Sequence, residues 1–368
     1  MNDILSYSIL AFVASTVSGL IFIPIILNFC KRKKLYDLPN ERKVHKNAIP
    51  RLGGISFMPS MMVAFLLVLL LIGKSTGHDI HVSLWSCCFI IGLVMIYATG
   101  IIDDLVGLSA RTKFAVQILA AALLPLSGLY LNQFYGFLGM GDIPFWIGAL
   151  LTVFTIVFID NAINLIDGID GLAAGLSFLA LLGFWFCFYN YTLVTYCVLI
   201  AGLMGVLVPY LYFNILGGPT RKHKIFMGDS GSLTLGFILG VLFVKYAMHN
   251  PAVMEYRREG LTTSITMLIV PMFDVVRVVI TRRFHHRALF EADKNHLHHK
   301  LMRAGLNQHK TLVVILTLAL MFGAVNYILV YKIDISLTIV LVIDILLYLL
   351  FDQGINHAIR KNGQKPFA

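Results

Sequence analysis

The sequence predicts an all-α, polytopic integral membrane protein with about eleven transmembrane helices, its N-terminus outside and its C-terminus cytoplasmic. Apolar residues make up 58% of the 368 residues and charged residues only 13%, with a mean hydropathy of +0.82. Apolar runs of membrane-spanning length recur along the whole chain, and basic residues gather in alternate connections. This composition excludes a soluble globular domain, a disordered chain and a soluble nucleic-acid-binding protein.

The apolar runs have the length that a helix needs to cross a bilayer. They lie at about 4–29, 53–73, 83–102, 114–131, 144–160, 171–189, 192–213, 231–248, 262–281, 311–331 and 334–352. The first run is too long for a signal peptide, lacks a basic segment before it and is followed by the basic run 31–34. It is therefore predicted to be a retained helix. No internal repeat appears, so residues 1–368 are predicted to form a single transmembrane domain.

Basic residues predict the orientation of the helices. The run Lys31-Arg32-Lys33-Lys34 is expected in the cytoplasm, which leaves the N-terminus outside. From this start, about 23 of the 29 Lys and Arg residues fall in predicted cytoplasmic loops and about four in outside loops. The cytoplasmic segments are expected at about 30–52, 103–113, 160–170, 214–230 and 282–310. The net charge of +10 thus indicates anionic lipid or a polyanionic substrate as the partner, and no nucleic acid.

Polar side chains cluster at these predicted cytoplasmic ends, where charge beside a membrane is expensive unless it has a function. Asp103 and Asp104 close the third run, and a divalent cation or a lysine such as Lys113 would relieve their mutual repulsion. The alternative is an ordinary helix C-terminus, with Ser109 capping the next helix. That alternative explains the acids poorly, because negative charge at a helix C-terminus opposes the helix dipole.

A second polar group follows the fifth run. Within ten residues it contains Asn161, Asn164, Asp167 and Asp170, with glycines that permit a sharp turn. Such side chains suit a hydroxyl-rich, charged ligand or a hydrated metal ion. The alternative, two Asx-type turns between helices, requires fewer polar side chains.

The third group is Phe226-Met227-Gly228-Asp229-Ser230-Gly231-Ser232, which opens the eighth run. Asp229 and the serines are candidates to cap that helix. Alternatively, the turn binds an anion and Asp229 holds a metal ion shared with phosphates. Phe226 is a candidate either to stack on a flat base or simply to pack.

Histidines form the fourth group. His296, His298 and His299 are flanked by lysine and arginine, which favours hydrogen bonding to phosphate; the alternative is a solvated loop. Their spacing matches no usual zinc pattern, and the five cysteines predict neither a disulfide framework nor a metal site.

Asp274 and Arg277 are expected on the cytoplasmic half of the ninth run. Acids that can hold a divalent ion, surrounded by basic residues at a membrane face, indicate metal-assisted phosphoryl transfer to a lipid.

Taken in order, these motifs resemble the polyprenyl-phosphate N-acetylhexosamine-1-phosphate transferases over nearly the whole chain. They are PRLGG at 50–54, DD at 103–104, NxxNxxDGxDGLAxG at 161–175, FMGDSGS at 226–232, PxxDxxR at 271–277 and HLHH at 296–299. HLHH followed by RAG is similar to the bacterial enzymes that use UDP-GlcNAc and undecaprenyl phosphate. The branch that uses UDP-MurNAc-pentapeptide usually has three consecutive histidines, where this chain has Leu297.

The resemblance implies transfer of GlcNAc-1-phosphate from UDP-GlcNAc to undecaprenyl phosphate with release of UMP, as the first membrane step of cell-envelope polysaccharide synthesis. It implies Mg²⁺, with Mn²⁺ as a substitute, and a multi-pass protein of the inner membrane whose active site faces the cytoplasm. Homodimers are common in the family. The catalytic residues implied are Asp103, Asp104 and Lys113, and the metal ligands Asp229 and Asp104. The implied substrate-binding residues are Asn161, Asn164, Asp167, Asp170, Phe226, Arg277, Arg283, His296, His298, His299, His45, Lys46 and Arg51.

Alternatives stay open at this point. Another UDP-HexNAc donor or UDP-MurNAc-pentapeptide would use the same chemistry, and both direct attack and a covalent aspartyl-phosphate route are compatible with the residues. A transferase that uses a nucleotide-activated lipid would show DGxxAR, which is absent. A secondary transporter would place its acids near mid-bilayer, often in repeated halves.

Overall fold

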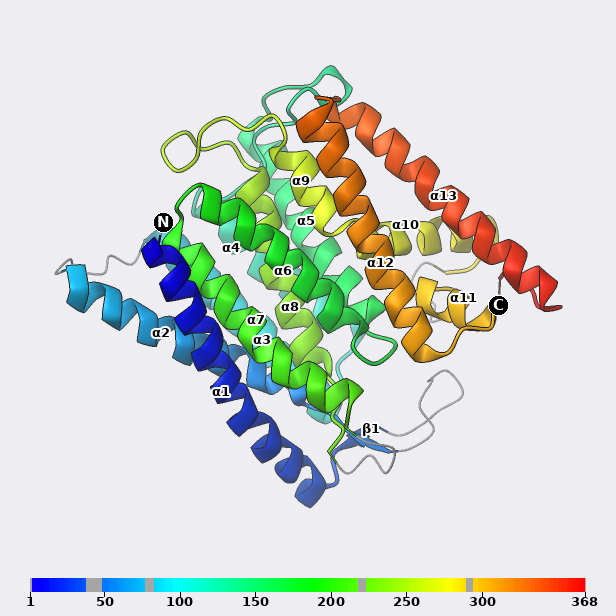
Figure 1. Ribbon diagram of the computed structural model, residues 1–368, viewed down its shortest axis with the longest axis horizontal. Helices are drawn as coiled ribbons and strands as arrows, with labels where there is room; N and C mark the ends of the chain where they lie inside the picture. Colours follow the sequence, from blue (N-terminus) through cyan, green and yellow to red (C-terminus); the bar gives the residue numbers. More distant parts are fainter. Residues whose placement is uncertain (1, 38–47, 77–82, 218–222, 289–293, 368) are drawn as a thin grey trace.

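The computed structural model describes residues 2–37, 48–76, 83–217, 223–288 and 294–367. These residues form an α-helical bundle with one two-stranded sheet (Figure 1). The helices are α1 (Asn2–Lys33), α2 (Phe57–Thr76), α3 (Leu84–Val106), α4 (Ala110–Leu126), α5 (Phe145–Ile166), α6 (Leu172–Asn190), α7 (Val194–Ile215), α8 (Asp229–Ala247), α9 (Gly260–Met267), α10 (Ile269–Phe284), α11 (Leu297–Arg303), α12 (Gln308–Tyr327) and α13 (Leu337–Lys361). Short helical turns lie at Gly53–Ser56, Phe137–Gly139 and Ile328–Lys332.

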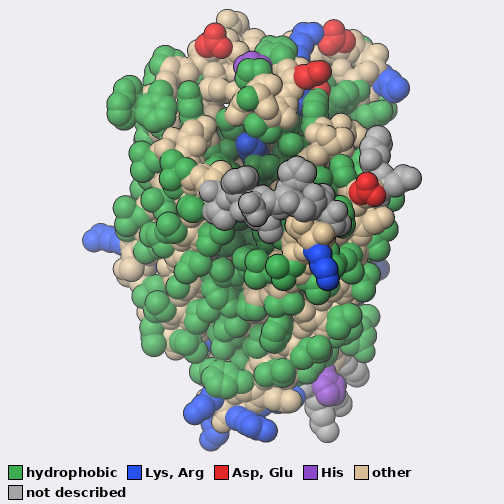
Figure 2. Space-filling view, turned by 90° about the vertical axis from the view of Figure 1, so that its left-hand side faces the viewer, with side chains coloured by type: hydrophobic (Ala, Val, Ile, Leu, Met, Phe, Trp, Pro, Cys, Tyr) green, Lys and Arg blue, Asp and Glu red, His purple; other side chains and the backbone are tan. Residues whose placement is uncertain are grey.

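The prediction of an all-α membrane protein is confirmed. Within the described ranges, nine helices are long and apolar enough to cross a membrane, or ten if α9 and α10 count as one bent span. Each predicted apolar run overlaps one long helix, except the ninth, which overlaps both α9 and α10; α4 is only 17 residues long. Hydrophobic side chains cover the flank of the molecule, and Lys and Arg gather at its lower end in Figure 2.

The ninth predicted run is not one straight helix. α9 and α10 meet at an angle of 75°, with the break at Leu268. Pro271 explains its position, because its ring nitrogen cannot donate to the carbonyl of Met267 and its ring would clash with that carbonyl in a continuous helix. The break turns α10, which carries Asp274 and Arg277, away from the direction of α9.

α8 is the core of the bundle. All of its apolar window is buried, whereas the corresponding windows of α1, α12 and α13 are only 22% buried and expose apolar side chains. α8 packs against α3 and α5, and its first residue, Asp229, lies where the ends of those two helices meet. The packing therefore brings three polar helix ends together.

A short sheet holds the segment before α8. β1 (Tyr36–Asp37) pairs antiparallel with β2 (Ile49–Pro50). The chain after β2 continues the pairing with the residues that precede α8: Phe226 N–H donates to the carbonyl of Pro50, and Gly53 N–H to that of Phe226, both at 2.8 Å. The PRLGG motif is thus the backbone support of the FMGDSGS motif.

Candidate active site

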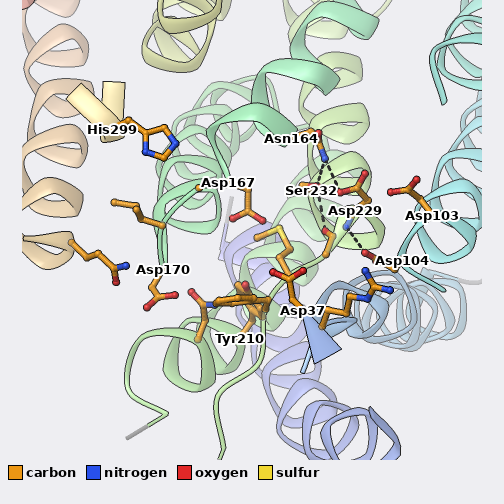
Figure 3. Close-up of a pocket in the computed structure, with 18 residues that line it drawn as sticks. Asp37, Asp103, Asp104, Asn164, Asp167, Asp170, Tyr210, Asp229, Ser232 and His299 are labelled. Carbon is orange, nitrogen blue, oxygen red and sulfur yellow. Dashed lines mark hydrogen bonds between the residues drawn. The ribbon is translucent and has the colours of Figure 1, made fainter. Parts of the chain in front are cut away.

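A cavity of about 370 Å³ opens where these polar ends meet (Figure 3). Carboxylates dominate its lining. The acidic side chains come from β1, the end of α3, the turn after α5 and the start of α8, namely Asp37, Asp103, Asp104, Asp167, Asp170 and Asp229. Arg51, Asn164, Phe226 and His299 also line it, so ten residues widely separated in sequence share one space.

The Asp104 carboxylate caps α8. Its Oδ1 accepts the N–H of Asp229 and its Oδ2 that of Ser230, each at 2.9 Å, and only 5% of the residue is exposed. Negative charge at a helix N-terminus is favourable because the first N–H groups lack partners within the helix. Gly228 leaves room for this contact: its φ is +73°, and a Cβ there would lie 2.5 Å from Asp104 Oδ2.

This contact excludes one alternative that the sequence left open. Asp229 and the following serines do not cap α8, because Gly228 occupies the cap position and provides no side chain. By contrast, Ser109 caps α4 as predicted, since its Oγ accepts the N–H of Thr112 at 3.1 Å. The capping of α8 is non-local, which sequence spacing alone does not reveal.

Lys113 lies between two acids. Its Nζ is 2.7 Å from Asp229 Oδ2 and 3.2 Å from Asp103 Oδ2, and the three side chains are between 16% and 25% exposed. The second oxygen of Asp103 accepts the N–H of Leu108 at 2.7 Å, which ties the α3–α4 turn to the acid. A single ammonium thus offsets the repulsion of two carboxylates in a place that an anionic ligand can reach.

Asn164 holds the other oxygen of Asp229. Its Nδ2 donates to Asp229 Oδ1 at 3.2 Å and to Ser232 Oγ at 2.8 Å. Asn161, one turn earlier on α5, lies elsewhere: its amide donates to Gln117 and to the carbonyl of Val157, outside the residues that line the cavity. The structure therefore separates the two asparagines that the sequence grouped together.

Asp167 and Asp170 face the same cavity from the turn after α5 (Figure 3). Burial raises the pKa of Asp167 to about 7, reinforced by the charges of Asp229, Asp170 and Asp104. Asp170 forms an ion pair with Lys224, whose ammonium also lies 5.4 Å from the centre of the Phe226 ring. Phe226 lines the cavity as a flat apolar surface beside these charges.

Arg51 lies on the other wall of the cavity. Its Nε is buried and has no hydrogen-bond partner among the described residues, while its carbonyl accepts the thiol hydrogen of Cys30 at 2.9 Å. A guanidinium donor without a protein partner suits an anionic ligand. His45 and Lys46, which the resemblance also implied, lie outside the described residues.

The three histidines of HLHH have three different surroundings. His296 Nδ1 donates to Asp274 Oδ2 at 2.8 Å, and the side chain lies outside the cavity lining. His298 is buried against Gly168, and neither ring nitrogen has a partner in the described part of the chain. Only His299 lines the cavity. Burial holds the pKa of His298 well below its usual range and lowers that of His299 to about 4, so both rings are neutral at pH 7.

Two arginines implied for the sugar lie away from the cavity. Arg277 donates to Asp274 Oδ1 at 2.7 Å and to the carbonyl of Asn295, inside a buried network. Arg283 is exposed at the end of α10 and is absent from the lining. Like His296 and Asn161, these two arginines do not line the cavity. Their positions therefore do not favour the predicted roles in substrate binding, because a side chain turned away from the cavity cannot contact a ligand in it directly.

Other lining residues were missed by the sequence argument. They are Asp37, Ile169, Tyr210, Asn214, Met227, Ser232 and Gln308. Ser232 belongs to a recognised motif, but Tyr210 lies in an apolar helix and Gln308 starts α12 without any distinguishing pattern. Their participation follows from packing rather than from local sequence.

The donor set suits a hard cation better than zinc. Across the described ranges, no three His, Cys, Asp or Glu side chains converge as a complete metal site. Mg²⁺ does not need one, because it is usually held by one or two carboxylates, with waters and substrate phosphates completing the shell. The partly exposed carboxylate of Asp229, which contacts the ammonium of Lys113, fits that requirement.

Comparison with known proteins gives a consistent result. The profile of glycosyl transferase family 4 matches residues 86–247. A probable undecaprenyl-phosphate N-acetylglucosaminyl 1-phosphate transferase of Bacillus subtilis (strain 168) is 31% identical over 86% of this chain and 83% of its own length. The undecaprenyl-phosphate alpha-N-acetylglucosaminyl 1-phosphate transferase of Yersinia pestis is 29% identical over 80% of this chain and 76% of its own length. The enzyme of the same name from Escherichia coli (strain K12) is 28% identical over 93% of this chain and 90% of its own length.

Proposed function

The chain belongs to glycosyl transferase family 4, the polyprenyl-phosphate N-acetylhexosamine-1-phosphate transferases, and from this premise we propose that it transfers GlcNAc-1-phosphate from UDP-GlcNAc to undecaprenyl phosphate. UMP is the second product. The names of the relatives support the sugar and the acceptor. The observation that carries the proposal is a cavity at one end of the membrane helices that is lined by Asp103 and Asp229, two acids that share the ammonium of Lys113.

The reaction is a substitution at phosphorus. An oxygen of the lipid phosphate attacks the β-phosphorus of the donor, and the bond from that phosphorus to the oxygen of UMP breaks. A phosphate monoester has a second pKa near 6, so about nine-tenths of the acceptor is dianionic at pH 7 and needs no strong base. The main barrier is the electrostatic repulsion between the two anionic substrates, and cationic groups in the site reduce this repulsion.

Arg51 lines the cavity, and Lys113 is not itself in the lining but contacts the lining acids Asp103 and Asp229. These are the two cationic groups that we assign to the phosphates. We assign Lys113 to neutralising phosphate charge and Asp103 to orienting that ammonium through their 3.2 Å contact. Asp229 would hold Mg²⁺, which when bound would neutralise charge on the donor diphosphate. Asp104, fully used in capping α8, is better assigned to positioning Asp229 than to metal ligation.

The other side of the cavity suits the nucleotide. Asp167 and Asp170 offer acceptors for ribose hydroxyls or the uracil N–H, and Phe226 offers a flat surface for the base. His299, neutral at pH 7, is a candidate to donate to the sugar or a phosphate. A neutral imidazole is both a donor and an acceptor, so it can bind without adding charge.

We further propose eleven spans, counting α4 and the bent α9–α10 pair, with the N-terminus outside and the cavity facing the cytoplasm across the inner membrane. Support comes from the basic residues that end α1, because the chain leads from them directly through β1 to the cavity. A reporter fused to the N-terminus should be periplasmic and one fused to the C-terminus cytoplasmic. A cytoplasmic N-terminus would contradict this topology.

UMP release from purified protein tests the activity. The complete mixture contains undecaprenyl phosphate, Mg²⁺ and UDP-GlcNAc, while parallel mixtures omit the lipid or the metal, or replace the donor by UDP-GalNAc or UDP-MurNAc-pentapeptide. UMP that requires lipid, metal and UDP-GlcNAc supports every part of the proposal. UMP release with a different donor but not with UDP-GlcNAc would overturn the proposed donor. UMP release in EDTA without added metal would overturn the assignment of Asp229 as a metal ligand.

A further inference from the structure

Two buried cations lie at the end of α8 opposite the cavity. Lys245, in the last turn of α8, is 7% exposed, and Arg257, in the connection to α9, is 2% exposed. Lys245 follows Asp229 by 16 residues, which separates them by roughly 24 Å along the helix axis. Within the described part of the chain, neither cation forms an ion pair with a carboxylate. Buried positive charge without an acidic partner is costly and calls for an anion.

Aromatic rings surround the Lys245 ammonium. Nζ lies 5.6 Å from the centre of the Trp85 ring and 5.5 Å from that of Tyr196. Contacts of this kind offset only part of the free energy that burying an ammonium costs. Rings also leave the three N–H donors of the ammonium without a conventional acceptor. Among the described residues, none accepts a hydrogen bond from Nζ, and the buried Trp85 Nε1 also has no partner.

Arg257, by contrast, donates from both terminal nitrogens to carbonyls, although its buried Nε has no hydrogen-bond partner among the described residues. It donates to the carbonyls of Tyr246 and Met248 at 2.8 and 2.9 Å and to the carbonyl of Glu255 at 3.0 Å. These contacts hold the connection after α8 over the end of that helix. Carbonyls do not cancel the charge of the guanidinium, so Arg257 adds positive potential while Lys245 and Trp85 keep free donors.

We propose that Lys245 and Trp85 bind the phosphate of an anionic lipid at the membrane surface opposite the cavity. A lipid phosphate supplies the missing charge together with acceptors for the ammonium and the indole N–H. Free phosphate has the same chemistry, but the position favours a lipid. Trp85 lies in the first turn of the candidate span Leu84–Val106 and Lys245 in the last turn of the span Asp229–Ala247, at the level where Trp and Tyr meet lipid headgroups.

Thermal unfolding in detergent tests the site without any measurement of activity. Phosphatidylglycerol, phosphatidylcholine and inorganic phosphate are titrated separately into wild-type protein and Lys245→Met. Loss of a charged donor should raise the phosphatidylglycerol concentration for half-maximal stabilisation at least about tenfold. Lys332→Met is the matched control, because Lys332 is exposed beside a single ring, Tyr327 at 6.0 Å, and should respond as wild type does.

Two further variants separate the donor from the ring. Trp85→Phe keeps a ring but removes the N–H and should weaken the response to phosphatidylglycerol, whereas Tyr196→Phe keeps the cation–ring contact and should not. These variants also decide the matter if Lys245→Met does not fold. Equal stabilisation of wild type and Lys245→Met, or of wild type and Trp85→Phe, would overturn the proposal. Equal stabilisation by phosphatidylcholine or by phosphate alone would overturn the assignment to an anionic lipid.

Discussion

The Asp104 carboxylate accepts the N–H of Asp229 at 2.9 Å across a sequence separation of 125 residues. The acid at the end of α3 therefore sets the start of α8, and with it the direction in which the Asp229 side chain leaves the helix. Lys113 and Asn164 donate to the two oxygens of the Asp229 carboxylate, and Ser232 in turn accepts from Asn164. Asp104 and Asp229 thus have different tasks. Asp104 fixes the start of α8, whereas the partly exposed carboxylate of Asp229 can contact a ligand.

Asp104→Asn should lower both stability and activity. An asparagine can accept one of the two N–H groups, but its NH₂ faces the other donor and leaves it unsatisfied, at a cost of about 1–3 kcal/mol. Thermal unfolding in detergent measures the loss. Asp142→Asn is the control, because among the described residues that exposed side chain accepts only from Gln133. An unfolding midpoint for Asp104→Asn equal to that of the control would argue against the capping role.

Asp229→Asn should lose UMP release by about 10³-fold or more while its unfolding midpoint stays near that of wild type. Asparagine preserves the shape and keeps one of the two accepting oxygens. Its NH₂ replaces the other oxygen at a side chain that is 25% exposed, where water can take over the lost contact, so the main loss is the charge. Lys113→Met should also reduce turnover, because it leaves the Asp103 and Asp229 carboxylates without their shared cation. Asp142→Asn again provides the control. Wild-type turnover by Asp229→Asn would contradict the assignment of this carboxylate.

The raised pKa of Asp167 predicts a pH-dependent stability. Folding moves this pKa from 3.8 to about 7, so between these values the folded protein keeps a proton that the unfolded chain loses. The contribution of Asp167 to stability is fully present below pH 3.8 and is lost as the pH rises through about 7. The midpoint of wild type should therefore fall relative to that of Asp167→Asn between pH 5 and 8, measured in EDTA. A constant difference would show that the pKa is not raised.

The sequence predicted the helices and the residues around Asp229 because both depend on local signals. Apolar runs indicate helices that face lipid. Polar residues beside them indicate a functional site, because placing such residues at a membrane costs free energy. The break between α9 and α10 could have been inferred from Pro271, which fell within a run that otherwise appeared continuous. The cap that Asp104 provides, and the participation of Tyr210, depend on how helices pack, which spacing does not encode.

The histidine motif illustrates the same limit. HLHH marks the right segment, yet only His299 lines the cavity, because α11 turns the neighbouring side chains toward α10 and the loop at Gly168. Arg277 likewise belongs to the network that holds α11 rather than to the lining. A motif thus identifies a structural unit, whereas the direction of each side chain is set by the helix that carries it.

Asp352, on α13, should position the histidine helix. It contacts Lys300 of α11 and lies 3.6 Å from Arg277 Nε, and Arg277 in turn donates to the carbonyl of Asn295. Asp352→Asn should therefore raise the KM for UDP-GlcNAc roughly tenfold through displacement of His299, with little change in the KM for undecaprenyl phosphate. Asp334→Asn is the control, because its pair with Arg258 is exposed and contributes little.

Lys300→Met and the double variant test whether the two side chains act together. If they do, their effects on the KM for UDP-GlcNAc should not add, because either change breaks the same contact. A lower unfolding midpoint with both KM values unchanged would leave Asp352 with a stabilising role only and contradict positioning.

Gly168→Ala should distinguish a positioning role of His298 from direct binding of the donor. A Cβ at residue 168 would lie 2.1 Å from His298 Nε2, so the ring or the loop must move. We expect lower stability and lower turnover from this variant. Gly323→Ala is the matched control, because a Cβ added there would meet no atom within 4 Å among the described residues beyond its own stretch of helix, and alanine favours a helix. If His298 only supports the loop, adding His298→Ala removes the clash and should restore part of the unfolding midpoint and part of the turnover. If His298 binds the donor directly, the double variant should regain stability without regaining turnover. The buried position of His298 and its absence from the cavity lining favour the first outcome.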